Sequence, residues 1–246
     1  MNKDLTLISA SYNTPNVTEN MLKSFTNLYK ECKILISENS TNNNTETILK
    51  KNNIPYFRNQ NGLHGPSVDM LLEKITTNYA LLVDTDVIFL KDCSNIFQQF
   101  IDMDLTLMGE IVGDRGGKRL HKRVNPWHCF INVKNIKENN IKFYDETRMR
   151  SKDFVRYDIG SSFFEDIRNN KLKIGNFNGE GNFYKHYEGM SWRVNRYLNT
   201  PLDGDIDNNS NDTHNNLGLY NYGKFVEQTY LKETEKYKNL KIVYNN

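Results

Sequence analysis

The first hundred residues alternate between short apolar runs and amphipathic stretches. Continuous apolar runs of strand-forming residues predict four strands, at residues 5–9, 33–38, 54–58 and 79–83. The last run is apolar throughout rather than at alternate positions, which is typical of a strand buried on both faces. The predicted strand at residues 79–83 therefore belongs to the interior of the protein.

Apolar residues recur at helical spacing between these runs. Met21, Phe25 and Leu28 define one predicted helix after a turn at residues 13–16. A second helix begins around Pro66, in the first turn where helices favour proline. Residues 39–47 are polar and predict a loop. Strands that alternate with helices indicate a mostly parallel sheet with helices on both faces, so we predict an α/β fold with a Rossmann-like half.

The pattern is looser after residue 100. It predicts strands at residues 105–109 and 130–133, and a helix at 158–170 whose apolar face holds Ile159, Phe163 and Ile167. A glycine-containing basic loop lies at 113–123. A polar stretch at 202–216 and a closing helix at 222–237 complete the prediction.

The composition is that of a globular chain. Hydrophobic residues make up 37%, charged residues 25% and aromatic residues 12%, whereas disordered chains are poor in aromatics. The formal net charge of +2 gives no overall basic field that would argue for nucleic acid. No apolar run approaches the roughly 18 residues needed to cross a bilayer, and the first is too short for a signal peptide. With three cysteines that share no metal-type spacing, we expect a cytoplasmic protein without a membrane span.

Two aspartates, Asp84 and Asp86, directly follow the buried strand at residues 79–83 and precede a second apolar run. In an open parallel sheet, ligands bind beyond the carboxyl ends of the strands. Two carboxylates there can reach one divalent cation, and Mg or Mn prefers oxygen ligands. Such a cation would neutralise a diphosphate leaving group. An isolated Asp-X-Asp is usually a solvated turn, but a charged pair between two apolar runs needs a reason, which favours a metal site.

With this motif in place, the chain resembles family 2-like glycosyltransferases of the GT-A fold over most of residues 4–193. The segment from Ile8 to Asn13 is similar to the strand end where these enzymes seat the nucleotide base, which implies contacts from Ser9 and Tyr12. Ile36-Ser-Glu38-Asn-Ser-Thr41 is similar to their Asp-Asn-Ala-Ser-Thr segment. Glu38 stands in place of the aspartate that commonly hydrogen-bonds uracil.

The resemblance also implies donor and metal residues. Asn61-Gly62-Leu-His-Gly65 is similar to the Asn-X-Gly loop of the family, whose glycines let the backbone approach the donor, although a plain turn is the alternative. Asp84 and Asp86 match the Asp-X-Asp motif, with Asp86 the firmer ligand and Asp84 also near the donor. His186 fits the histidine that closes the metal site in many GT-A enzymes, and neutral imidazole is an acceptable ligand beside two carboxylates.

Asp158 is the candidate catalytic base. Tyr157-Asp158-Ile-Gly-Ser-Ser162 is similar to the region that holds the catalytic aspartate in inverting members, whose usual Glu-Asp pair is Tyr-Asp here. An attacking hydroxyl must lose its proton, and a carboxylate within hydrogen-bond reach can take it. A helix N-cap is the alternative role for Asp158. Glu165-Asp166 is a rival pair, expected on a solvated helix face.

Two further features have open interpretations. Trp127-His128 would suit a platform for the flat face of a sugar, or would simply belong to the core. A basic cluster would be a solvated loop, a lid over a diphosphate or a contact to an anionic acceptor; it comprises Arg115, Lys118, Arg119, Lys122 and Arg123.

These observations favour a metal-dependent, inverting glycosyltransferase that uses Mn or Mg and a nucleotide sugar, with a UDP-sugar preferred and a glycan as the default acceptor. We expect a GT-A domain over residues 1–200, with a nucleotide-sugar half at 1–100, an acceptor half at 101–200, and a loop and helix at 201–246. Three alternatives stay open: transfer to hydroxymethylated DNA bases, a nucleotidyltransferase, and an inactive glycan-binding module. A nucleotidyltransferase would usually carry a basic, glycine-rich loop after the first strand, where residues 11–16 have neither lysine nor arginine.

Overall fold

The computed structural model describes residues 3–60, 62–114, 119–150, 154–187, 190 and 225–244. Within these ranges, no helix combines the length and the apolar character needed to cross a membrane.

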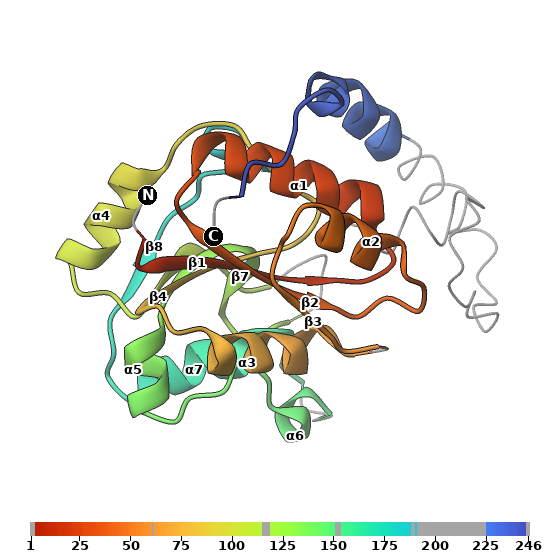
Figure 1. Ribbon diagram of the computed structural model, residues 1–246. Helices are drawn as coiled ribbons and strands as arrows, with labels where there is room; N and C mark the ends of the chain where they lie inside the picture. Colours follow the sequence, from red (N-terminus) through yellow and green to blue (C-terminus); the bar gives the residue numbers. More distant parts are fainter. Residues whose placement is uncertain are drawn as a thin grey trace.

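A seven-stranded sheet with the order β3-β2-β1-β4-β7-β6-β8 forms the centre of the protein (Figure 1). The first four of these strands run parallel to their neighbours, and so do β6 and β8, whereas β7 is antiparallel to both β4 and β6. The strands of this sheet are β1 (Leu5–Ser11), β2 (Lys33–Glu38), β3 (Tyr56–Arg58), β4 (Tyr79–Val83), β6 (Leu107–Val112), β7 (Arg123–Asn132) and β8 (Ile174–Asn176). The sheet is therefore mostly parallel, as the sequence predicts.

Helices cover both faces of this sheet (Figure 1). One face packs against α1 (Pro15–Leu28), α2 (Asn44–Lys51) and α4 (Ser94–Asp102), and the other against α3 (His64–Lys74), α5 (Val133–Glu138) and α7 (Ser161–Asn169). The short α6 (Glu146–Met149) has no buried residue. This arrangement confirms the predicted α/β class with a Rossmann-like half.

Alternation along the central strands assigns each side chain to one of two cores. In β4, Leu81 and Val83 pack with the α1 face, whereas Ala80 and Leu82 pack with the α3 face. Successive side chains of a strand point to opposite faces, so a continuous apolar run fills both cores. The apolar run of β4 is thus anchored in both cores, and its carboxyl end leads to Asp84.

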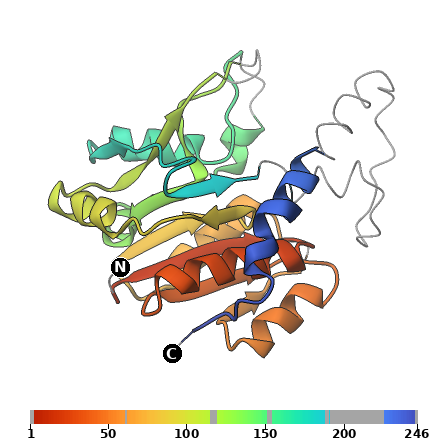
Figure 2. The same cartoon turned by 90° about the horizontal axis from the view of Figure 1, so that it is seen from above.

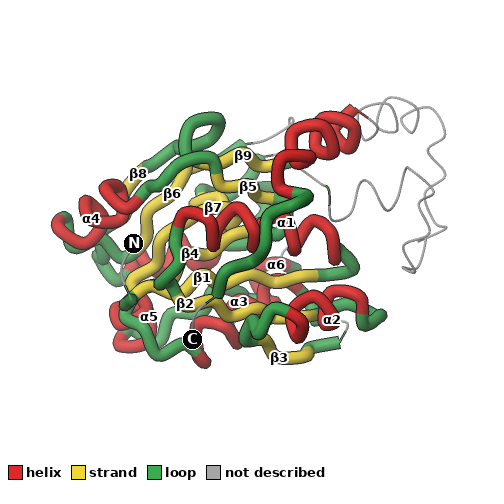
Figure 3. Tube along the Cα trace, turned by 45° about the horizontal axis from the view of Figure 1, so that its top comes forward, coloured by secondary structure: helices red, strands yellow, loops and turns green. Residues whose placement is uncertain are grey.

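A second, two-stranded sheet joins distant parts of the chain. β5 (Val87–Phe89) pairs antiparallel with β9 (Tyr184–His186). Residues 225–234 are helical, and the 3-10 helix η1 (Glu235–Tyr237) follows. Together they lie against α1 and β5, as Figures 2 and 3 show, through a buried cluster that includes Val17, Ile88 and Tyr230.

Some boundaries differ from the prediction. The expected loop at residues 39–47 is wrong from Asn44 onward, because α2 begins there with only Thr45 and Leu49 buried, too few apolar positions to produce a helical pattern. β7 begins at Arg123 rather than at residue 130. The helix expected from residue 158 begins at Ser161, after Gly160, whose φ of 84° is incompatible with a helix. Residues 202–216 lie outside the described ranges.

Candidate active site

Asp84, Thr85 and Asp86 form a tight turn between β4 and β5. The amide of Val87 donates to the carbonyl of Asp84 at 3.2 Å, and the amide of Asp84 lies 3.4 Å from the carbonyl of Trp127 on β7. Thr85 is buried, and its hydroxyl lies 3.3 Å from that of Thr14. Both carboxylates therefore stand at the carboxyl end of a central strand on a turn that the surrounding backbone holds.

The pairing of β5 with β9 brings His186 to this turn. His186 is in register with Val87, and the amide of Tyr187 donates to the carbonyl of Asp86 at 2.9 Å. The imidazole Nε2 of His186 lies 3.2 Å from Oδ1 of Asp86. One ligand atom from each of Asp84, Asp86 and His186 falls within 4.8 Å of the others. Two carboxylates and an imidazole in this space suit Mn or Mg, so the three residues expected to bind metal meet in one cluster.

Each aspartate of the turn contacts a histidine. His64, the first residue of α3, places Nε2 at 3.3 Å from Oδ1 of Asp84. Burial alone would lower the pKa of His64, but the contact with Asp84 raises it above its ordinary value. Burial likewise would raise the pKa of Asp84, but the contact with His64 holds it below the usual range. In the sequence analysis, His64 is only one residue of the Asn-X-Gly loop. No local pattern indicates its contact with Asp84.

His186 has a second set of partners. Its ring stacks on Trp127 with centroids 4.5 Å apart, and its amide donates to both carboxylate oxygens of Glu180 at 3.1 Å. Burial would lower the pKa of His186, but the hydrogen bond and charge of Asp86, with smaller effects from Asp84 and Glu180, raise it above its ordinary value. The imidazole is thus held in an acidic environment.

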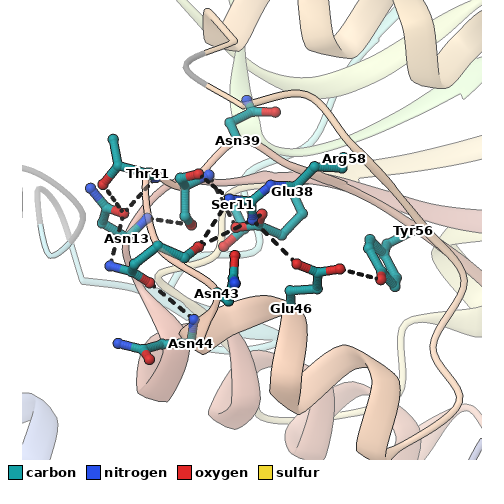
Figure 4. Close-up of polar contacts among 12 residues, drawn as sticks. Ser11, Asn13, Glu38, Asn39, Thr41, Asn43, Asn44, Glu46, Tyr56 and Arg58 are labelled. Atoms are coloured by element: carbon teal, nitrogen blue, oxygen red, sulfur yellow. Dashed lines mark hydrogen bonds and ion pairs between the residues drawn. The ribbon is translucent and has the colours of Figure 1, made fainter.

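The residues expected to bind the nucleotide lie at the ends of β1 and β2. Tyr12 follows β1 and is 42% exposed, whereas Ser9 is buried within the strand and its hydroxyl has no hydrogen-bond partner among the described residues. Glu38 is fully buried. Its carboxylate pairs with Arg58 and accepts the amide of Ser40 at 3.0 Å (Figure 4). The contribution of these residues to nucleotide binding stays a prediction.

Asn13 connects the same two strand ends, although the sequence analysis assigns no separate role to it. Its amide donates to the hydroxyl of Ser40 at 2.8 Å, and its side-chain oxygen accepts the amide of Thr41 at 3.1 Å (Figure 4). Its φ of 52° lies in the left-handed region, which asparagine tolerates better than most residues. The local signal for this role in the sequence was an asparagine two residues after the end of a strand.

The loop before α3 needs its glycines for close packing. The amide of Gly62 donates to the carbonyl of Asn59 at 2.8 Å, and a Cβ at Gly62 would lie 2.1 Å from the Asn59 side chain. A Cβ at Gly65 would lie 2.3 Å from the ring of Tyr144. Asn61 is outside the described ranges. The close approach seen is thus between parts of the chain, and contact with a donor at Gly62 stays a prediction.

Asp158 forms an ion pair. Its Oδ2 lies 3.0 Å from the guanidinium of Arg123, and its Oδ1 accepts the amide of Ile159 at 2.8 Å. Gly160, not Asp158, occupies the N-cap position of α7. Burial raises the pKa of Asp84, and the Arg123 charge helps to lower it together with the larger effects of His64 and His186. Arg123 is therefore close enough to influence both Asp158 and the candidate metal cluster.

The rival carboxylates on α7 are engaged elsewhere. Arg148 contacts Asp166 at 2.8 Å and Glu165 at 3.5 Å, and the hydroxyl of Tyr157 donates to Glu165 at 2.7 Å. Both carboxylates therefore serve to hold α6 and the segment before α7 against that helix.

A pocket of about 440 Å³ lies beside His186. Its walls include Trp127, Glu110, Glu180 and Phe225. Both oxygens of Glu110 are held, by the side-chain amides of Asn125 at 2.6 Å and of Asn178 at 3.0 Å. The size lies within the range of small-ligand sites, and the acidic and amide groups can hydrogen-bond hydroxyls.

His128 belongs to the core and not to this pocket. It is 1% exposed, and its ring stacks on Tyr184 at 4.2 Å. Burial lowers its pKa to about 3. The two residues of the Trp127-His128 pair therefore have different environments, one at the pocket and one in the interior.

The basic loop is only partly described, since Arg115 and Lys118 lie outside the described ranges. The guanidinium of Arg119 lies over the exposed ring of Phe154 at 4.6 Å, and backbone hydrogen bonds connect this segment to Arg156. Arg123 is buried at the start of β7 and belongs to the Asp158 ion pair. The cluster predicted from sequence therefore includes both a surface loop and a residue of the site.

Comparisons with known proteins agree with the fold described above. The model of "Glycosyl transferase family 2" matches residues 6–164. Among solved structures, S. aureus TarS superposes with a TM-score of 0.54 at 18% identity, over 74% of this chain and 36% of that one. TarS 1-349 in complex with UDP gives 0.52 at 16%, over 74% and 59%.

A third similar structure is the mannosyltransferase PcManGT from Pyrobaculum calidifontis in complex with GDP-Man and Mn2+. It has a TM-score of 0.54 at 10% identity, over 95% of this chain and 73% of that one. The chain spans 36% of the length of TarS, and at these identities the similarity shows the fold. No curated protein matches the sequence.

Proposed function

The chain belongs to glycosyl transferase family 2, as a glycosyltransferase of the GT-A fold, and from this premise we propose that it transfers a sugar with inversion and with the help of a divalent cation. The observation that carries this proposal is the meeting of Asp84, Asp86 and His186 within 4.8 Å. Mn or Mg bound there would neutralise the charge of the diphosphate leaving group.

The proposed donor is a nucleotide sugar, with a UDP-sugar preferred. Its base would lie at the ends of β1 and β2, beside the exposed ring of Tyr12, with Ser9 and Glu38 behind it in the strands. Asn61 and Gly62 would border the donor from the loop before α3. Two observations support this arrangement: β1 lies beside β4, which leads into the turn at Asp84, and the similar TarS 1-349 structure is a complex with UDP.

Asp158 is the proposed catalytic base. As the acceptor oxygen attacks the anomeric carbon, its proton would pass to the Asp158 carboxylate, and the bond from that carbon to the diphosphate would break with its electron pair. A single displacement of this kind inverts the anomeric configuration. The side chain of Asp158 is 40% exposed, which leaves it accessible to an acceptor, and Arg123 fixes its direction at 3.0 Å.

The proposed acceptor is a glycan hydroxyl, bound in the pocket beside His186. Glu110, Glu180 and Trp127 offer hydrogen-bond acceptors and an aromatic ring, which suit the hydroxyls and C–H faces of a sugar. A phosphate-rich acceptor such as DNA would meet two carboxylates in this pocket, so we favour the glycan.

The first test measures binding of nucleotide sugars by thermal shift and calorimetry, with and without Mn. We expect a UDP-sugar to stabilise the wild-type protein in Mn and much less in EDTA, because a ligand that binds only the folded state raises its stability. Asp86→Asn, which keeps the side-chain shape, should remove the Mn dependence, and Asp102→Asn on the exposed end of α4 is the matched control. Binding and transfer that survive both complete chelation and Asp86→Asn would contradict the proposed metal role.

A further inference from the structure

The residues on either side of His186 share one carboxylate, that of Glu233 in the C-terminal helix. Nζ of Lys185 lies 2.7 Å from Oε1 and 2.8 Å from Oε2 of Glu233. The hydroxyl of Tyr187 donates to Oε2 of the same carboxylate. Glu233 therefore holds both neighbours of the candidate metal ligand.

These contacts bear on the direction of the His186 ring. Side chains alternate along an extended strand, so Lys185 and Tyr187 point away from the face that His186 presents to Asp86. If the pairing of β9 with β5 shifted by one residue, His186 would turn to the face now occupied by Lys185 and Tyr187. β9 has only three residues, and two-stranded pairs of this length are marginal without other support. Contacts to Lys185 and Tyr187 thus oppose rotation of His186 away from Asp86.

The helix that carries Glu233 is itself held against the rest of the protein. Tyr230, one turn before Glu233, is buried; its hydroxyl accepts from the side-chain amide of Asn20 at 2.8 Å, and its ring packs edge-on against Tyr187 at 5.0 Å. The hydroxyl of Tyr237 lies 3.3 Å from the carbonyl of Phe89 on β5. The helix that carries Glu233 is therefore fixed to α1 and to the partner strand of β9.

We propose that Glu233 is a positioning residue for the metal site, acting through Lys185 and Tyr187 to hold the His186 imidazole beside Asp86. The inference rests on the proposed metal role of Asp84, Asp86 and His186. It extends the site to a residue that lies outside the segment matched by the family model, which ends at residue 164.

The test compares Mn binding by calorimetry and electron paramagnetic resonance in Glu233→Gln, Tyr187→Phe and the wild type. The neutral amide of Glu233→Gln loses the ion pair with Lys185, and Tyr187→Phe removes one donor while its ring can stay against Tyr230. Loss of groups that orient metal ligands typically weakens metal binding by about 10- to 100-fold, so we expect about a tenfold loss for Glu233→Gln and a smaller one for Tyr187→Phe. Glu235→Gln is the matched control, because Glu235 contacts exposed Lys238 at 3.3 Å.

The double variant Glu233→Ala/Tyr187→Phe should bind Mn no more weakly than Glu233→Ala, because Tyr187 acts through its hydrogen bond to Glu233. The melting temperature without metal reports any general loss of stability separately. Wild-type Mn affinity in Tyr187→Phe and Glu233→Gln would overturn the inference, and Tyr187→Phe alone decides if Glu233→Gln does not fold. Failure of the wild type itself to bind Mn would instead overturn the proposed metal role.

Discussion

At the scale of single residues, Asp84 and Asp86 differ in exposure although they share a turn. The Asp86 side chain is 4% exposed and faces His186, whereas the Asp84 side chain is 29% exposed and faces His64. A buried carboxylate needs a compensating positive partner, so Asp86 depends more on a cation or on His186 than Asp84 does. This difference supports the expectation that Asp86 is the firmer ligand.

Asp158 allows a prediction at the same scale. Asp158→Asn keeps the side-chain shape but cannot accept the acceptor proton, so transfer should fall by at least about 100-fold. Calorimetry should show unchanged binding of the nucleotide sugar, because Asp158 is not proposed to contact the donor. Product analysis by NMR on the wild type should show inverted anomeric configuration.

Two outcomes would weaken this role. Near wild-type transfer by Asp158→Asn would exclude it as the base. Loss of donor binding in the same variant would point to a structural role through Arg123. Asp145→Asn alters an ion pair between the N-cap of α6 and Arg148, so it is the control for a general effect of removing one carboxylate.

At the scale of elements, strand β7 serves both the site and the core. Trp127 faces the pocket and stacks on His186, while His128 packs between Tyr184 and Phe130 in the interior. The alternation of a strand produces this division directly. An uncharged imidazole is thus part of an aromatic core.

The burial of His128 predicts a pH dependence of stability. The unfolded chain binds a proton on this histidine near pH 6.5, whereas the folded protein resists protonation until about pH 3. The unfolded state therefore binds more protons between these values, and the free energy of unfolding falls as the pH falls below about 6.5, by about 2 kcal/mol at pH 5 from this group.

Denaturant unfolding at pH 7 and pH 5 measures this effect. His128→Phe, which keeps an aromatic ring, should lose less stability between the two pH values than the wild type by about 2 kcal/mol. His121→Phe is the control, because His121 stacks on Tyr157 outside this core. Equal pH dependence in His128→Phe and the wild type would show that His128 titrates normally in the folded protein.

Some helices and strands could be predicted from local sequence patterns and others could not. β2 and β4 follow from continuous apolar runs, and α1 and α3 from helical periodicity, which for α3 is joined by a proline in the first turn. α2 was missed because it buries only two positions. β5 and β9 have three residues each and depend on pairing between segments about a hundred residues apart, which no local pattern reports.

The candidate site also has a part that could be predicted from the sequence and a part that could not. Asp84, Asp86 and His186 were named from a strand-end motif and a family resemblance, and the fold brings them together. The contacts of His64, Arg123 and Glu233 could not be named, because each is a tertiary approach between elements remote in sequence. The residues of the candidate metal cluster were thus predictable from the sequence, and the groups that hold them in place were not.

At the scale of the whole molecule, the charge balance leads to a test of the acceptor. The chain has a formal net charge of +2, and the proposed acceptor pocket carries Glu110 and Glu180. Transfer to a neutral glycan should therefore change little between 50 and 200 mM salt, measured at saturating donor. Binding of a DNA acceptor through several phosphates would weaken by about 10³-fold or more over that range.

The same assay on a variant with Arg119→Gln and Lys122→Gln gives the control. A glycan transferase should retain its rate, because Arg119 packs on Phe154 rather than in the pocket. A steep loss with salt and with these substitutions would instead favour the DNA acceptor.

The pairing of β5 with β9 also determines when the active site can exist during synthesis. The sheet from β1 to β4 can form once the first part of the chain has left the ribosome, since domains generally fold as they emerge. His186 joins the Asp84 turn only after another hundred residues, and Glu233 follows later still. A nascent chain that already contains the family segment therefore still lacks His186 of the proposed cation site, and that site can be complete only after β9 has paired with β5.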